Sequence, residues 1–378
     1  MDFILSEEQE MLRKTARDFL AERCPKSLVR EWQESDKGYS LELWQEMASL
    51  GWLGLVFPEE YGGNGMSFLE LAVLLDEMGR ACLPSPFFST VVLGGLPILD
   101  IGSEEQKQAY LPRIAKGRLI FTLALTEPSA RYDADAIMVT AAANEGEYII
   151  NGTKLFVSDA HVSDFVIVIA KTGLSGKSED GITGFIVDTK SPGIGCTLLK
   201  TTAGDKLSKI DFNQVSVRRE DILGKLNQGW GEVENILSRS AVAKCCEIVG
   251  SVQQVLEMTV DYARTRRQFG QPIGSFQSIQ NHCANMAIDV ESSRYITYRA
   301  AWMLAMNIPC RKEAAMAKAW TADAYLRAVS LSHQVHGAVA FTIDHDLNYH
   351  TRRIKAAEVS FGDTGFHLER VAQEIGLG

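Results

Sequence analysis

The feature that most constrains this chain is a change of hydrophobic periodicity that occurs twice along its length. Apolar residues recur at helical spacing, then give way to short β-rich runs separated by turn residues, and then return to helical spacing. At 378 residues the chain also exceeds what a single core usually supports. We therefore expect a mainly helical α+β protein with a helical domain over 1–118, a β-sandwich or barrel domain over 119–229, and a C-terminal four-helix bundle over 230–378.

Local signals support this division. Ser6 precedes three glutamates within the next four positions, which is typical of a capped helix start. Asn151-Gly152 lies between two β-rich runs and predicts a hairpin turn. Long helices are expected in the last third of the chain over Ala241–Ala263, Ser275–Asn307, Arg311–His336 and Tyr349–Gln373.

Composition excludes several classes of protein. With 46% hydrophobic residues the chain is not disordered, and a formal charge of −10 without a basic block argues against nucleic-acid binding. The seven cysteines have no regular spacing, which argues against a disulfide framework. The first residues do not have the pattern of a signal peptide, and no apolar run is long enough to span a membrane. A cytoplasmic protein is expected.

Common catalytic motifs are missing from the sequence. It contains no GxSxG, no P-loop and no GxGxxG after a strand, which disfavours serine hydrolases, NTPases and Rossmann dehydrogenases. His333 and His336 are three residues apart, but no acid or cysteine completes a metal-binding pattern. The residue patterns alone therefore indicate no reaction.

Four segments resemble signatures of the acyl-CoA dehydrogenase family: TEPSARYDADAIMVTA, EYIINGTKLFVSDA, YARTRRQFGQPIGSFQSIQ and QVHGAVAF. Their order and the helical–β–helical layout match that family over the whole chain. The resemblance implies the fold expected above and FAD as cofactor. It also implies an enzyme that removes two hydrogens from Cα and Cβ of an acyl-CoA thioester, in fatty acid or lipid catabolism.

The resemblance also implies positions for cofactor contacts. Leu125, Thr126 and Ser158 match contacts of the isoalloxazine ring, and Thr364 matches a further flavin contact. One segment departs from the family, because Ser129–Asp133 stands where Gly-Ala-Gly-Ser-Asp is usual, and lost glycines remove close backbone approach. The positions matched to the FAD of a neighbouring subunit or to the pyrophosphate are Arg266, Gln268, Phe269, Gln277, Gln334 and Gly337.

Neither of the family's usual positions for the catalytic base holds an acid. Gly362 occupies the base position of the C-terminal Tyr-Glu-Gly-Thr motif, and Ser240 occupies the alternative position on the first long helix. Glu247 lies two turns after Ser240 among small and apolar residues, where desolvation would suit a carboxylate for proton abstraction. Two other interpretations stay open: Glu247 pairs with Lys244 or faces solvent, and Asp363 is the base.

The leading hypothesis is an FAD-dependent acyl-CoA dehydrogenase with Glu247 as the base. By resemblance, its electrons would pass to electron-transferring flavoprotein or a similar acceptor, and the chain would form a homo- or hetero-tetramer or a dimer. Two alternatives remain: a non-catalytic or flavin-sharing subunit of a heteromeric acyl-CoA dehydrogenase, and a flavin oxidase or monooxygenase on the same fold.

Overall fold

The computed structural model describes residues 4–173, 178–342 and 344–377, and it divides into two compact units. The bundle unit comprises Met1–Arg30, Ser67–Leu83 and Ser238–Gly378. The sheet unit comprises Glu31–Met66 and Pro84–Leu237. Each unit thus contains segments that are far apart in the sequence. The predicted division into domains over 1–118, 119–229 and 230–378 stays a prediction.

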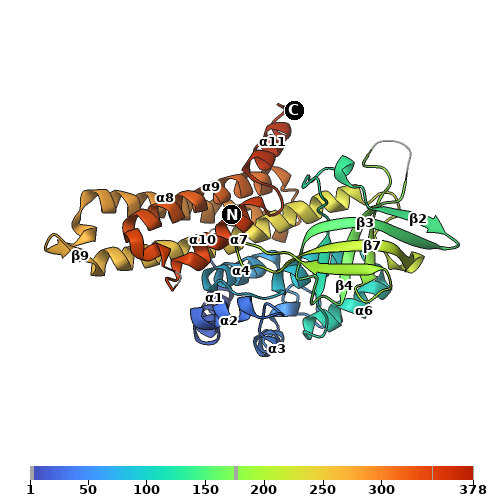
Figure 1. Cartoon of the computed structure of the whole chain (residues 1–378), viewed down its shortest axis with the longest axis horizontal. Coiled ribbons are helices and arrows are strands. Elements are labelled where there is room, and N and C mark those ends of the chain that lie inside the picture. Colours follow the sequence, from blue (N-terminus) through green and yellow to red (C-terminus); the bar gives the residue numbers. More distant parts are fainter. Residues whose placement is uncertain (1–3, 174–177, 343, 378) are drawn as a thin grey trace. The chain divides into compact units, whose positions relative to one another are not determined.

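The sheet unit is built on one eight-stranded mixed sheet, in the order β6-β7-β3-β2-β4-β5-β8 with β1 parallel to β4 (Figure 1). Strands β4 and β5 are the most apolar and are buried along almost their whole length, which explains their uninterrupted hydrophobic sequences. The strands are β1 Phe121–Ala124, β2 Thr140–Asn144, β3 Glu147–Ser158, β4 Phe165–Lys171, β5 Ile182–Asp188, β6 Ile194–Leu198, β7 Leu207–Arg218 and β8 Ile222–Leu223.

The hairpin prediction at Asn151-Gly152 is wrong. The turn lies earlier, between β2 and β3, where Glu145 and Gly146 both adopt positive φ values of 48° and 95°. Such a pair of left-handed residues matches the twist of a two-residue hairpin. Gly152 instead lies within β3 at a register shift against β7, with φ at 133°, so the asparagine–glycine signal marks a β-bulge.

Helices complete the sheet unit. A π-helix over Phe88–Gly95 packs beside β1, where the hydroxyl of Thr90 accepts a hydrogen bond from the backbone N–H of Phe121 at 3.3 Å. The other α-helices of this unit are α3 Leu41–Ser49, α5 Leu96–Ile101 and α6 Glu104–Ala115. Four 3₁₀ turns lie at Trp52–Gly54, Glu59–Tyr61, Ala134–Ala136 and Arg219–Asp221. Helix α2 Lys26–Glu34 begins in the bundle unit and ends in the sheet unit.

The bundle unit consists of long helices around a shared core (Figure 1). Apolar residues of α7, α8, α9 and α10 meet in this core, as Val252, Val290, Tyr325 and Ile354 illustrate. The predicted helix start at Ser6 is confirmed, with a reciprocal capping box to Gln9. The helices are α1 Glu7–Arg23, α4 Phe68–Ala81, α7 Trp230–Thr265 (in this unit from Ser238), α8 Gln277–Ala305, α9 Arg311–His336, α10 Leu347–Val359 and α11 Thr364–Glu374, with 3₁₀ turns at Ile273–Ser275 and Gly337–Phe341.

The single helix expected over Tyr349–Gln373 is wrong, because a turn separates α10 from α11. Gly362 adopts φ of 103° in this turn, and Asp363 caps α11 by accepting a hydrogen bond from the N–H of Phe366 at 2.8 Å. Lys318, whose side chain is fully buried, donates to the carbonyls of Glu358 and Gly362 at 2.8 and 2.9 Å. Its ammonium therefore holds the last turn of α10 and the following loop together.

Two glycines allow α4 and α7 to pack at very close range. A Cβ added at Gly79 would lie 2.0 Å from the carbonyl oxygen of Glu247, and one added at Gly250 would lie 1.7 Å from that of Asp76. Only hydrogen fits at these two positions, so the contact fixes how α7 presents Glu247.

The predicted fold class, an α+β protein that is mainly helical with a β-rich middle and a C-terminal bundle, is confirmed. Among the described residues, no helix is long and apolar enough to cross a membrane.

Buried histidines make the stability of the bundle unit depend on pH. Burial lowers the pKa of His367 to about 4 and that of His350 well below its usual 6.5. Because the pKa values of both histidines are lower in the folded than in the unfolded state, protonation favours unfolding. The protein has its full stability above pH 6.5 and loses stability as the pH falls towards the pKa values of the folded state. For His367 alone, we expect the free energy of unfolding to fall by about 2 kcal/mol between pH 7 and pH 5.

Denaturant titrations at pH 7, 6 and 5 measure this loss, and the same series on His367→Gln should show a smaller slope. An equal slope in the variant would contradict the assignment to His367.

Candidate active site

In the sheet unit, the structure brings the three predicted isoalloxazine contacts close together, where the segment after β1 meets the end of β3. Leu125 and Thr126 directly follow β1, and the carbonyl of Thr126 accepts a hydrogen bond from the N–H of Leu155 in β3 at 2.8 Å. Ser158 ends β3, and its carbonyl accepts from the hydroxyl of Thr122 at 2.6 Å. Thr126 and Ser158 are half-buried, so both side chains reach the surface of this unit.

Phe156 was not predicted as a site residue, although it lies between these contacts. It has φ of 55°, sits in the β-bulge between Lys154 and Val157, and leaves 51% of its surface exposed. Its neighbours Lys154 and Val157 are buried, so the exposed ring of Phe156 stands out at this edge of the strand and is a candidate contact for a ligand. The sequence does contain a signal for this bulge: three apolar residues in a row, Leu155-Phe156-Val157, interrupt the alternation of apolar and polar residues that a regular strand would show.

The segment that departs from the family is a solvent-exposed turn. Ala130 adopts φ of 55°, and its N–H donates to the carbonyl of Glu127 at 2.8 Å. Arg131 replaces a usual glycine and forms an ion pair with Asp133 at 2.8 Å. The turn therefore exists without the glycines, but the guanidinium of Arg131 and the ring of Tyr132 stand where the usual pattern has glycine and serine.

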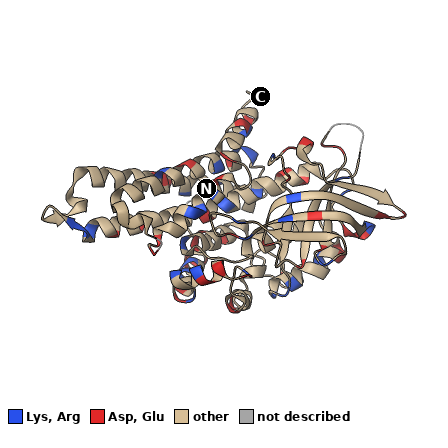
Figure 2. Cartoon of the chain, in the orientation of Figure 1, with Lys and Arg blue, Asp and Glu red and all other residues tan. Residues whose placement is uncertain are grey.

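At one end of the bundle unit, four of the predicted residues lie in or beside a short hairpin: Arg266 precedes it, Gln268 and Phe269 belong to it, and Gln277 begins α8. Strands β9 Arg267–Gln268 and β10 Gln271–Pro272 form the hairpin, and the side chains of Arg266, Gln268, Phe269 and Gln277 are all exposed. Phe269 is 92% exposed, with only an edge contact to the ring of Phe276 at 6.0 Å. This tip is strongly basic (Figure 2), and the guanidinium of Arg266 forms no ion pair within the described part of the chain.

The other two predicted residues lie at the same end of the bundle. Gln334 is exposed on the last turn of α9, and Gly337 ends that helix with φ of 67°. His336 stacks on Tyr262 of α7 with ring centroids 4.5 Å apart, and Val335 joins Ile273 in a small core. The structure therefore brings the end of α9 and the β9–β10 hairpin together.

Glu247 lies on α7 with 22% of its side chain exposed. One carboxylate oxygen accepts a hydrogen bond from Nζ of Lys244 at 2.5 Å, so the ion pair that the sequence left open is present. The flanking side chains of Cys246 and Ile248 are buried, and burial raises the pKa of the Cys246 thiol well above its usual value. Glu247 is thus a partly accessible carboxylate in an apolar setting, with a lysine beside it.

The other candidate positions offer no free base. Gly362 has no side chain, and Asp363 caps α11 as described above. Thr364, predicted to contact the flavin, donates its hydroxyl hydrogen to Asp323 at 2.9 Å. Ser240 is buried, and its hydroxyl has no hydrogen-bond partner among the residues that the structure describes.

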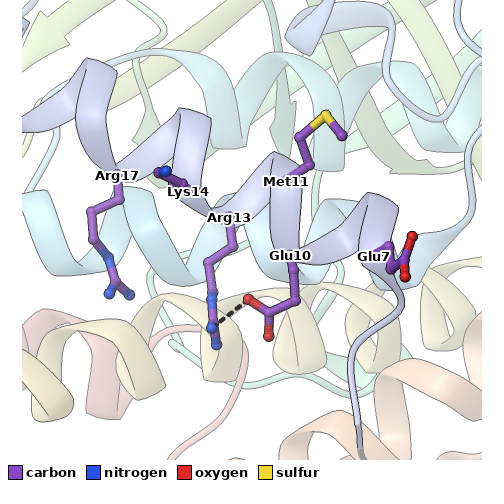
Figure 3. A pocket seen from close by; sticks show the side chains of 6 residues that line it. All are labelled: Glu7, Glu10, Met11, Arg13, Lys14 and Arg17. Carbon is purple, nitrogen blue, oxygen red and sulfur yellow. Dashed lines mark hydrogen bonds and ion pairs between the residues drawn. The ribbon is translucent and has the colours of Figure 1, made fainter.

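A groove on α1 is unrelated to these residues (Figure 3). Arg13 and Glu10 pair across it at 2.5 Å, and Arg17 is bound to the buried carboxylate of Glu77. The groove runs along one face of one helix and contains none of the predicted site residues. No cluster of three or more histidines, cysteines or acids that could hold a metal occurs in the described ranges.

The chain matches the sequence profiles of three domains in order. They are the acyl-CoA dehydrogenase N-terminal domain at residues 6–118, the middle domain at 122–215 and the C-terminal domain at 227–376. A helical–β–helical protein with these domains is a flavoprotein oxidoreductase.

Curated relatives agree with the profiles. The chain is 32% identical to the probable acyl-CoA dehydrogenase YngJ of Bacillus subtilis, over 99% of this chain and 100% of the relative. It is also 32% identical to the caffeyl-CoA reductase–Etf complex subunit CarC of Acetobacterium woodii, over 89% of each chain. The chain therefore belongs to the acyl-CoA dehydrogenase family, which confirms the resemblance seen in the sequence.

Solved structures show the same fold. Butyryl-CoA dehydrogenase from Megasphaera elsdenii superposes with a TM-score of 0.92 at 28% identity, covering 99% of this chain and 100% of the other. A structure described as PigA with FAD and proline superposes with a TM-score of 0.92 at 26% identity, covering 100% of both chains. The predicted cofactor, FAD, is confirmed as that of the family.

The residues of this chain fit FAD. In the sheet unit, Thr126 and Ser158 are half-buried residues with hydroxyl groups, and Phe156, two residues before Ser158, has an exposed ring. The bundle tip offers the guanidinium of Arg266, which suits a phosphate, together with amide side chains and the exposed ring of Phe269. Arg266 has no ion pair with the residues that the structure describes and Phe269 is 92% exposed, so both side chains are available to contact an anionic and aromatic cofactor.

Proposed function

We propose that this protein transfers two hydrogens between FAD and the Cα and Cβ atoms of an acyl-CoA thioester, with Glu247 as the acid–base group at Cα. The observation that carries the proposal is the carboxylate of Glu247, which is accessible, lies on a rigid helix and is held by Lys244. Both usual base positions lack an acid, so Glu247 is the candidate that remains with a geometry suited to the task.

In this proposal the chain's residues bind and orient the reactants. FAD, when bound, supplies the hydride acceptor for the hydrogen at Cβ. Thr126, Ser158 and Phe156 would contact the ring system, and the bundle tip with Arg266, Gln277, Gln334 and Gly337 would contact the phosphates or the adenine of an FAD. Lys244 would keep the carboxylate of Glu247 in one orientation while Glu247 takes or returns the proton.

The direction of the reaction and the electron carrier are parts of the same proposal. A relative named as a caffeyl-CoA reductase–Etf complex subunit supports electron exchange with an electron-transferring flavoprotein. The same two hydrogens move in dehydrogenation and in reduction, so one site can serve either direction. We further propose a tetramer or dimer, because the exposed Phe269 and Arg266 would then be covered.

A second candidate, a non-catalytic subunit of a heteromeric enzyme, is favoured by one observation. In the turn over Ser129–Asp133, Ser129 and Arg131 replace the two usual glycines, and Arg131 pairs with Asp133, which changes the surface that a ligand would approach. In that case the chain would supply its basic bundle tip to the FAD of an unlike partner.

Purification of the full chain distinguishes these candidates. We expect a yellow protein whose flavin absorbance near its visible maximum is bleached by an acyl-CoA under anaerobic conditions and returns on addition of an electron acceptor. A panel of straight, branched and aromatic thioesters identifies the acyl class. A colourless oligomer that takes up no FAD would instead support the non-catalytic subunit, and peroxide released in air at the rate of substrate oxidation would indicate an oxidase.

A further inference from the structure

A fully buried ion pair lies directly beneath the predicted flavin contacts of the sheet unit. The side chains of Lys154 and Glu127 are 0% and 3% exposed, with Nζ 2.7 Å from the carboxylate oxygen. Lys154 belongs to β3, two residues before Phe156, and Glu127 directly follows Thr126. Both partners are therefore joined by short backbone segments to the residues expected at the isoalloxazine ring.

The pair ties three backbone segments together. Nζ of Lys154 also donates to the carbonyl of Leu125 at 3.0 Å. The two oxygens of Glu127 accept from the N–H groups of Met138 and Val139 at 2.8 and 3.1 Å. The end of β1, the bulge of β3 and the start of β2 thus meet at one charged centre, where each partner makes at least two hydrogen bonds.

Stability alone does not explain a buried ion pair at this position. Burying a lysine and a glutamate carries a desolvation penalty that well-packed apolar residues of similar size would avoid. Burial accordingly lowers the pKa of Lys154 to about 8, although the adjacent carboxylate opposes that shift. The ion pair is therefore better explained by specificity than by stability: its directional hydrogen bonds fix the conformation of the attached backbone segments, which apolar packing would not do.

We propose that Lys154 and Glu127 are positioning residues that fix the Leu125–Thr126 segment and the Phe156 bulge in the conformation that binds the flavin ring. This inference rests on the proposed function. The inference adds an explanation of what holds the proposed flavin-binding residues in place. A binding site keeps its geometry only when the groups that support it are themselves fixed by packing and hydrogen bonds. Neither residue touches the cofactor in this proposal, because both side chains are buried.

The test compares full-length variants for FAD binding and for stability. Lys154→Met removes the donor to Leu125 but leaves Glu127 without its cation, so it will also destabilise the fold. The double variant Lys154→Met with Glu127→Gln is neutral, and its glutamine keeps one acceptor oxygen, which can serve the N–H of either Met138 or Val139. Lys209→Met, which removes a lysine paired with Asp211 on the surface of β7, is the matched control.

Without cofactor, we expect the double variant to be less destabilised than Lys154→Met, because it leaves no buried charge unpaired, yet to bind FAD at least about tenfold more weakly than the wild type. Its bound flavin should also have a visible absorption band closer to that of free FAD. The control should match the wild type in all three measurements. If the double variant is too unstable to purify, Glu127→Gln alone gives the comparison through the shift in thermal unfolding caused by added FAD, because its Lys154 has a pKa of about 8, can lose its proton and still bond to Leu125.

Wild-type FAD affinity and an unchanged flavin spectrum in the double variant would overturn this inference while leaving the proposed function intact. Failure of the wild-type chain to bind FAD would overturn both.

Discussion

Replacing Glu247 by glutamine is expected to slow the bleaching of the flavin by an acyl-CoA by roughly 10²–10⁴-fold, the range found when a positioned acid–base group is removed. Glutamine has the size of glutamate and can still accept a hydrogen bond from Lys244, so the helix should be undisturbed. FAD content and the flavin spectrum should stay as in the wild type, since Glu247 is not among the cofactor contacts. Anaerobic stopped-flow measurement of the reductive half-reaction reads out this rate directly.

Asp261→Asn is the matched control for this change. Asp261 lies on the same helix with 76% of its side chain exposed and forms only a 3.8 Å contact with Arg264, so its loss should leave the rate unchanged. A Glu247→Gln enzyme that bleaches within threefold of the wild type would show that this carboxylate is not the base. Asp363→Asn would then test the remaining acid, with the loss of the α11 cap checked by thermal unfolding.

A single methyl group at Gly250 is expected to destabilise the protein by about 2–3 kcal/mol. The added Cβ would lie 1.7 Å from the carbonyl oxygen of Asp76 and 2.7 Å from its carboxylate, so α4 and α7 must move apart. Because Glu247 lies one turn before Gly250, the same shift should also slow the acyl-CoA reaction. Denaturant unfolding and flavin bleaching measure the two effects.

Gly231→Ala on the same helix is the control. A Cβ there would meet no described atom within 4 Å, and alanine favours a helix over glycine by about 0.5–1 kcal/mol. This variant should therefore be as stable as the wild type or slightly more stable. Equal stability of the two alanine variants would mean that the α4–α7 contact is not as tight as the structure indicates.

Much of the fold was predictable because its signals are local. The periodicity of the last third placed α8 and α9 within two residues of their observed ends, and Ser6 marked the start of α1. The break between α10 and α11 was overlooked although Gly362-Asp363 contains both a helix stop and a helix start. The hairpin was misplaced because two glycine-containing turn signals lie six residues apart, and only strand pairing decides between them.

The site shows a similar division. Sequence motifs predicted the flavin contacts, which stay a prediction, and identified the two base positions that lack an acid; the spacing from Ser240 singled out Glu247 as the candidate base. They did not reveal the exposed ring of Phe156, because its position depends on a β-bulge. They also could not show whether Lys244 pairs with Glu247, since that depends on the side-chain conformations of both residues.

By itself, the sequence determined the family, the order of helical and β-rich segments and the residue types available to hold FAD, because these are carried by local patterns and short motifs. Only the tertiary structure decided that Lys154 and Glu127 form a buried pair next to the predicted flavin contacts, and that Lys318 holds the turn at Gly362. These contacts join residues that are 27 and 44 positions apart. Burial of a charge depends on what the rest of the chain packs around it, and no local pattern contains that information.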